Sequence, residues 1–148
     1  MEKTCSLEQM NEKIKREILK LLSKRDYFYQ EIKQKLVKKG FDEKEIEEAL
    51  KYFVENKYIQ DEKLKDRLKE LAIEKGKSKL AIKKKLYQKG VNIDIEISFE
   101  EELQSALNLL RKKYKKEKEF KKIVNYLMNR GFGYSVAKEA TKVFLTED

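Results

Sequence analysis

The chain has 148 residues, of which 43% are charged, and its formal net charge is +9. It has no histidine and a single cysteine, Cys5, which excludes an intrachain disulfide framework and a zinc site, since zinc needs several Cys or His ligands. No apolar run approaches the ~20 residues that span a bilayer, and residues 1–7 lack the apolar stretch of a signal peptide. We therefore expect a cytoplasmic protein with no membrane segment, no metal and no cofactor.

The positive excess lies in the later part of the chain. Residues 1–62 carry 14 basic and 14 acidic side chains, whereas residues 63–148 carry 22 basic and 13 acidic ones. Such a charge distribution favours a polyanionic partner, most simply nucleic acid. A lysine-rich protein from an AT-rich genome has the same composition, so charge alone does not separate the two interpretations.

The first three predicted elements are helices. Ser6–Gln9 has the spacing of a capping box, and an apolar stripe at helical spacing continues from Leu7 to Leu21. A second helix is predicted over about residues 27–39. The third begins at Asp42, whose carboxylate suits the positive end of a helix. It stops near Asn56, for which we predict the left-handed conformation.

The middle of the chain contains two further predicted helices and one ambiguous segment. A helix begins at Asp61 and ends near Gly76, and Ser78 is placed to cap the next one, which ends at Gly90. Residues 91–98 alternate between apolar and polar side chains, as a strand would. Because the corresponding segments elsewhere in the chain are helical, we predict a short irregular helix or a connector.

Three more helices are predicted at the end of the chain. One begins near Phe99 and carries an apolar stripe as far as Tyr114. A charged bend at residues 115–118 separates it from a helix over roughly residues 119–130. The last helix follows Gly131.

Three glycines, Gly40, Gly90 and Gly131, share one local pattern. In each case apolar residues lie eight and four positions before the glycine, on one helix face, and another lies one position after it. A basic last turn followed by glycine is typical of a helix end, because the cation suits the negative pole and glycine adopts the left-handed conformation without a Cβ clash. Recurrence at intervals of 50 and 41 residues predicts a repeat architecture.

Together the elements predict an all-α fold, an elongated, curved array of three tandem three-helix repeats. We place the repeats at residues 1–60, 61–98 and 99–148, with a short third helix in the second. No catalytic residue is predicted, because histidine is absent and no glycine-rich loop of the Walker or Rossmann type is found.

Several segments, taken in order, resemble the RecX family, whose members regulate the RecA recombinase. These are Ser23–Tyr27 with Gly40–Leu50, the join Lys57–Lys63, the middle stretch from Asp61 through Gly76 and Ile82 to Val91, and Leu127–Val136. The resemblance covers roughly residues 12–146. Lys57 and Gln60 depart from the pattern, since they stand where the family usually has Gly and Asp.

The resemblance implies a non-enzymatic role in DNA repair, homologous recombination and the SOS response. The protein is expected to bind RecA–DNA filaments as a monomer and to inhibit ATP hydrolysis and strand exchange. Its implied partners are the RecA filament and single- or double-stranded DNA. The residues leave two alternatives open, a general nucleic-acid-binding helical-repeat protein and a helical scaffold for another protein.

Two concentrations of basic side chains are the predicted contacts to DNA or to the filament. They comprise Lys75, Lys77, Lys79, Lys83, Lys84, Lys85 and Lys89, and then Arg111, Lys112, Lys113, Lys115, Lys116, Lys121 and Lys122. Positions 75, 79 and 83 share a face only if one helix runs through Gly76, which we do not expect. The alternative for each lysine is a solvated helix face. We expect most of the interleaved tyrosines to be core residues, with stacking on bases as their alternative.

Overall fold

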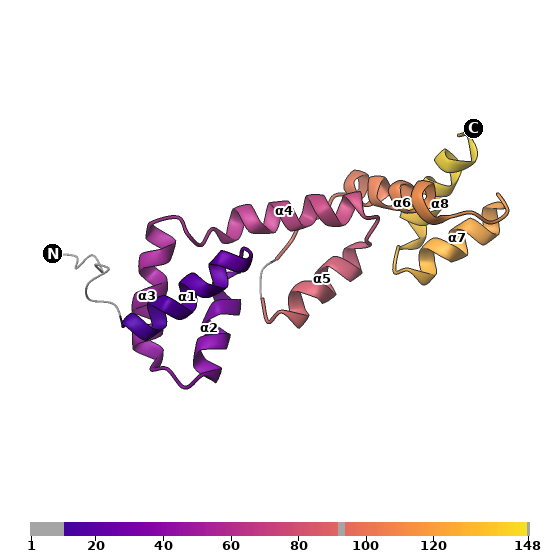
Figure 1. Ribbon diagram of the computed structural model, residues 1–148. Coiled ribbons are helices and arrows are strands. Elements are labelled where there is room, and N and C mark those ends of the chain that lie inside the picture. The colour runs from indigo at the N-terminus through magenta and orange to yellow at the C-terminus, as the bar shows by residue number, and fades with distance from the viewer. Residues whose placement is uncertain (1–10, 92–93, 148) are drawn as a thin grey trace. The chain divides into compact units, whose positions relative to one another are not determined.

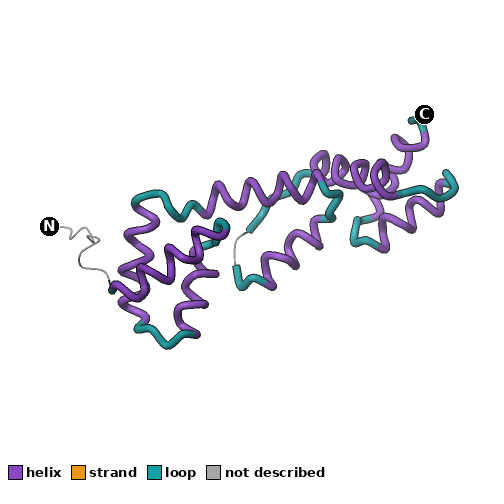
Figure 2. The backbone as a smooth tube through the Cα atoms, in the orientation of Figure 1, coloured by secondary structure: helices purple, strands orange, loops and turns teal. Residues whose placement is uncertain are grey.

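The computed structural model describes residues 11–91 and 94–147, and these residues form helices and no strand (Figure 1). Figure 2 shows the same helices joined by loops. The all-α class is confirmed, whereas the elongated, curved form and the three repeat boundaries stay predictions. The helices are α1 (Glu12–Lys24), α2 (Tyr29–Lys38), α3 (Glu43–Glu55), α4 (Asp61–Glu74), α5 (Lys79–Gln88), α6 (Phe99–Lys113), α7 (Phe120–Asn129) and α8 (Tyr134–Leu145).

The chain forms two compact units. The first contains α1, α2, α3 and the start of α4 up to Lys65, together with Lys89–Val91. The second contains the rest of α4, from Asp66, and the helices α5 to α8. Each unit has its own hydrophobic core.

In the first unit α1, α2 and α3 pack against one another (Figure 1). Each contributes apolar side chains at helical spacing. The buried residues of this core, which include Tyr27 and Ile59 from the loops beside the helices, are Ile14, Ile18, Tyr27, Ile32, Leu36, Ile46, Ala49, Leu50, Phe53 and Ile59. Asn11 caps α1 by accepting hydrogen bonds from the backbone N–H groups of Lys13 and Ile14 at 2.9 and 3.3 Å. The capping box predicted at Ser6–Gln9 lies outside the described residues.

The predicted glycine stops are confirmed, because Gly40, Gly90 and Gly131 have φ angles of +88°, +72° and +95°. After Gly40 the N–H of Phe41 donates to the carbonyl of Leu36 at 3.3 Å, and an equivalent bond of 3.2 Å follows Gly131. These bonds satisfy carbonyls that the helix itself leaves without a donor.

The left-handed stop predicted at Asn56 is wrong. Asn56 has a φ of −92°, and Lys57 adopts the left-handed conformation instead, with a φ of +63°. The N–H of Tyr58 then donates to the carbonyl of Phe53 at 2.8 Å. This register brings the two aromatic rings to 5.4 Å, the apolar contact that accompanies such a stop. The contact outweighs the intrinsic preference of asparagine for the left-handed region.

In the second unit α8 packs against both α6 and α7 (Figure 1). The buried core residues are Ala106, Leu107, Leu109, Leu110, Tyr114, Ile123, Val124, Leu127, Phe132, Val136, Ala137, Ala140 and Phe144. Ser98 and Glu101 form a capping box at the start of α6, each side chain accepting the other residue's backbone N–H at 3.1 Å. The acidic first turn and basic last turn of α6 suit its dipole.

Side chains on one face of α6 cap the end of α4. The amide of Asn108 donates to the carbonyl of Ile73 at 2.9 Å, and the ammonium of Lys112 donates to the carbonyl of Glu74 at 2.6 Å. Ser105, one turn earlier on α6, donates to a carbonyl in the turn that follows α4. The carbonyl of Glu74 thus finds its donor in α6, whereas the carbonyl of Ile73 also accepts the N–H of Gly76 at 3.0 Å.

The turn between α4 and α5 needs glycine at position 76 for two reasons. Gly76 has a φ of +79°. A Cβ there would lie 2.6 Å from the Cβ of Leu109 and 2.8 Å from its backbone nitrogen. Two residues later the hydroxyl of Ser78 accepts the N–H of Ala81 at 3.1 Å, so the predicted cap of α5 is confirmed.

The described part of the ambiguous segment is a connector. Residues 91 and 94–98 form neither helix nor strand, and residues 92 and 93 lie outside the described residues. Ile95 and Ile97 are buried, whereas the acidic residues beside them are exposed. The alternating pattern therefore reflects the burial of every second side chain without a strand partner.

Candidate nucleic-acid interface

Four lysines of the first predicted cluster line one cavity in the second unit. Lys75 and Lys77 lie in the turn after α4, and Lys84 and Lys85 lie on α5. They surround a cavity of about 630 Å³ whose apolar wall is formed by Leu68, Leu71, Ala72, Ala81, Ile82 and Leu86. We call this cavity the α4–α5 groove.

The charges of the α4–α5 groove are not neutralised by the described residues. All four lysines are exposed, and none of their ammonium groups makes an ion pair or a hydrogen bond with another described residue. Among the residues that the structure describes, no acidic side chain lines the groove. Four like charges above an apolar wall produce a positive potential that suits a phosphate backbone.

The other three residues of the first cluster lie elsewhere. Lys79 and Lys83 line a separate cavity together with Asp94, Glu96 and Glu101, so carboxylates share their surroundings. Lys79 and Lys83 do not line the same cavity as Lys75, because the chain leaves the helical conformation between α4 and α5, as expected. Lys89 is half-buried and belongs to the first unit.

Three residues of the second cluster have structural partners. The guanidinium of Arg111 donates from Nε to both carboxylate oxygens of Glu147 at 3.1 Å, and this hydrogen bonding raises the pKa of Arg111 and lowers that of Glu147. Lys112 caps α4, as described above. Lys122 pairs with Glu117 at 2.7 Å and with Glu119 at 3.4 Å, and the hydrogen bond with Glu117 is the main cause of its raised pKa.

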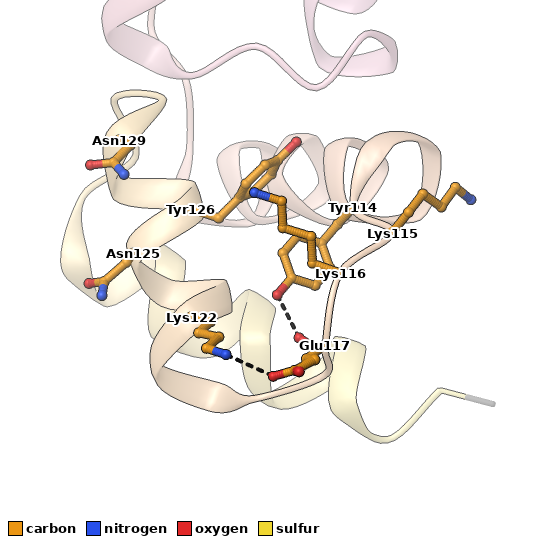
Figure 3. A pocket seen from close by; sticks show the side chains of 8 residues that line it. All are labelled: Tyr114, Lys115, Lys116, Glu117, Lys122, Asn125, Tyr126 and Asn129. Atoms are coloured by element: carbon orange, nitrogen blue, oxygen red, sulfur yellow. Dashed lines mark hydrogen bonds and ion pairs between the residues drawn. The ribbon is translucent and has the colours of Figure 1, made fainter.

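The remaining members of the second cluster are free of such contacts. Lys113, Lys115, Lys116 and Lys121 are exposed and make no ion pair or hydrogen bond from their ammonium groups with the described residues. Lys115 and Lys116 line a cavity beside α7, drawn in Figure 3. In the second cluster, therefore, some cations stabilise the protein's own structure and others remain able to bind a partner.

The structure also reveals polar and aromatic side chains that the sequence analysis missed. Asn125 and Asn129 line the same cavity as Lys115 and Lys116, and their i, i+4 spacing on a predicted helix was the available signal. Among the tyrosines, Tyr27 and Tyr114 are buried. In contrast, Tyr87 on α5 is 84% exposed, and Tyr58 and Tyr134 are also exposed.

Within residues 11–91 and 94–147, no three His, Cys, Asp or Glu side chains lie close enough together to hold a metal ion. None of the helices in this part of the chain is both long enough and apolar enough to cross a membrane.

Comparison with known protein families identifies two matches, one to an early and one to a late part of the sequence. Residues 15–53, which include most of α1 to α3, match the first three-helix domain of RecX. Residues 100–141, which include most of α6 to α8, match the third three-helix domain of RecX.

Full-length relatives agree with these matches. The chain is 34% identical to Regulatory protein RecX of Haemophilus influenzae (strain PittEE), over 78% of this chain and 84% of the relative. It is 30% identical to the protein of the same name from Vibrio vulnificus (strain CMCP6), over 82% and 86%. It is 33% identical to the one from Clostridium perfringens (strain 13 / Type A), over 82% and 64%.

Proposed function

The chain belongs to the RecX family, and on this premise we propose that it is a non-enzymatic regulator that binds RecA–DNA filaments and inhibits the recombinase. The observation that carries the proposal is the similarity to proteins named as regulators, which extends over about four-fifths of the chain. We further propose that it acts in homologous recombination and DNA repair in the cytoplasm.

The proposed mechanism is steric and electrostatic. Helical units occupy the surface of the filament, and the lysines of the α4–α5 groove bind phosphates as point charges. Binding releases counterions, so it weakens as salt rises. A monomer held by protein and by DNA would restrain the filament without any covalent chemistry.

The test uses purified protein with RecA assembled on single-stranded DNA. We expect the protein to pull down with the filament more strongly than with RecA alone or DNA alone. We also expect it to reduce DNA-dependent ATP hydrolysis when present at less than one molecule per recombinase molecule. Hydrolysis that is unchanged at equimolar protein would contradict the proposal.

The pull-down also separates the two alternatives. A general nucleic-acid-binding protein would bind bare DNA as strongly as filaments, because phosphates alone would determine its affinity. A scaffold for another protein would bind neither, and replacement of the groove lysines would leave its activity intact.

A further inference from the structure

A second cavity, of about 760 Å³, lies beside α7 and is distinct from the α4–α5 groove (Figure 3). Its lining residues are Tyr114, Lys115, Lys116, Glu117, Lys122, Asn125, Tyr126 and Asn129. Those at positions 122, 125, 126 and 129 have the spacing of one face of α7. The others belong to the loop between α6 and α7. We call this site the α7 cavity.

The loop that borders the α7 cavity is held by contacts to Glu117. The hydroxyl of Tyr114 donates to the carbonyl of Glu117 at 2.6 Å, and the ammonium of Lys122 pairs with its carboxylate at 2.7 Å (Figure 3). The ion pair neutralises the carboxylate of Glu117, the acidic group among the described lining residues, which would otherwise repel a phosphate. A loop ordered before the ligand arrives lowers the entropic cost of binding.

Two amides of α7 have unused hydrogen-bonding capacity. Asn125 and Asn129 are exposed, lie one turn apart, and make no side-chain hydrogen bond with another described residue. Each amide offers two donor hydrogens and one acceptor oxygen. Nucleobase edges carry donors and acceptors side by side, and asparagine pairs with them through two hydrogen bonds.

Tyr126 supplies a flat wall to the α7 cavity. The guanidinium of Arg130 lies 4.0 Å from the centroid of the Tyr126 ring, and the ring of Tyr114 meets it at 5.1 Å and 73°. These contacts hold the half-buried ring in one orientation. Because the guanidinium covers one face of the ring, a base would stack on the opposite face or on the guanidinium plane itself. Aromatic rings and guanidinium planes are the surfaces on which unpaired bases stack.

The cavity also has cations placed for the backbone of a nucleic acid. Lys115 and Lys116 are exposed and have no acidic partner among the described residues. In Figure 3 the side chain of Lys116 extends toward Tyr126, whereas that of Lys115 extends in the other direction. In the proposed complex these two ammonium groups are the contacts to the phosphates that flank the base.

We infer that the α7 cavity binds an unpaired base of single-stranded DNA. Asn125 and Asn129 contact the base edge, Tyr126 supports its face, and Lys115 with Lys116 binds the flanking phosphates. The choice of DNA as ligand rests on the proposed function. A duplex does not fit this scheme, because its bases are paired and stacked.

The experiment compares two fluorescent oligonucleotides of equal length by anisotropy at low salt, one of deoxyadenosine and one with abasic sugars. Both carry the same phosphates, so only the first can use the amides and the ring. We expect wild-type protein to bind the deoxyadenosine strand about tenfold more tightly. The double variant Asn125→Ala/Asn129→Ala should lose the part of this ratio that the two amides contribute and keep its affinity for the abasic strand.

A control variant and a folding check accompany the measurement. Gln30→Ala removes an exposed amide from α2 in the first unit, and it should leave the ratio unchanged. Alanine favours helix more than asparagine does, so the double variant should retain its circular dichroism spectrum. Equal binding of the two strands by wild-type protein, or an unchanged ratio in the double variant, would overturn the inference.

Crosslinking locates the base directly. A strand that contains 5-iodouracil is irradiated with the protein, and trypsin then releases the peptide Ile123–Arg130, which contains both asparagines and Tyr126. The inference expects the DNA adduct on this peptide, and an adduct confined to other peptides would contradict it. Filament binding is measured separately, so the α7 cavity and the proposed function can fail independently.

Discussion

At position 57 a lysine adopts a backbone conformation that favours glycine. Its φ is +63°, and its side chain is exposed. The left-handed region costs a residue with a Cβ about 1–2 kcal/mol. The resemblance to RecX marked this position as a departure, because glycine is usual there, and the structure supplies the physical reason for that glycine.

The substitution Lys57→Gly should therefore stabilise the protein. We expect the free energy of unfolding to rise by about 0.5–1 kcal/mol, since relief of the left-handed strain exceeds the added flexibility of the unfolded chain. Urea denaturation followed by circular dichroism measures the change. Lys20→Gly, at an exposed site inside α1, should instead lower stability by about 1 kcal/mol.

Two glycines with similar dihedral angles should respond differently to alanine. Gly40 has nothing within 4 Å of a new Cβ, so Gly40→Ala should cost only the left-handed penalty of about 1–2 kcal/mol. Gly76→Ala should cost about 1–3 kcal/mol more, because its Cβ would overlap the backbone of Leu109. Urea denaturation measures the free energy of unfolding of both variants. Equal decreases would show that Leu109 moves away from the new Cβ at little cost.

At the scale of single elements, the helices follow from local signals. Apolar periodicity defined their buried faces, and the glycine stops defined three of their ends. Asn56 was misjudged because the stop depends on a contact between residues five apart, Phe53 and Tyr58. Residue preference alone does not contain that contact.

The capping of α4 by α6 predicts different roles for adjacent lysines. Lys112→Met removes the donor to the Glu74 carbonyl and should lower the free energy of unfolding by about 1 kcal/mol. Lys113→Met is the matched control, because Lys113 is exposed and its ammonium group has no such partner within residues 11–91 and 94–147. The stability of this variant should stay within about 0.5 kcal/mol of wild type. Chemical denaturation distinguishes the two variants. Similar decreases in the free energy of unfolding would show that the hydrogen bond from Lys112 does not stabilise the protein.

At the scale of the whole molecule, some of the basic side chains form ion pairs or hydrogen bonds within the protein, whereas others remain able to bind a partner. The ammonium groups of the α4–α5 groove have no partner in the described part of the chain, whereas Arg111 and Lys122 form ion pairs with carboxylates. DNA binding should therefore depend on particular lysines rather than on net charge.

Replacement of Lys75, Lys77, Lys84 and Lys85 by Gln tests this dependence. If all four bind phosphates of single-stranded DNA, the slope of log affinity against log salt should decrease in magnitude by about 3. The control replaces Lys13, Lys20, Lys24 and Lys44, exposed lysines of the first unit, and changes net charge equally. Titrations at several salt concentrations provide the slopes, and equal slopes in the two variants would refute a special role for the groove.

The all-helical class and most helix ends could be predicted from the sequence because they depend on contacts between residues three to eight positions apart. The family resemblance could be recognised because it depends only on the order and identity of residues along the chain. The sequence did not indicate which basic residues have partners within the protein. Lys112 and Lys113 are chemically identical neighbours, and only the packing of α6 against the end of α4 directs one of them to a carbonyl. Likewise, Asn125 and Asn129 join Lys115 and Lys116 at one cavity because the loop after α6 folds back beside α7. The sequence determined the helices because their formation depends on the local spacing of apolar residues. Only the tertiary structure decided the partners of each side chain, because those partners are distant in the sequence and are brought together by packing.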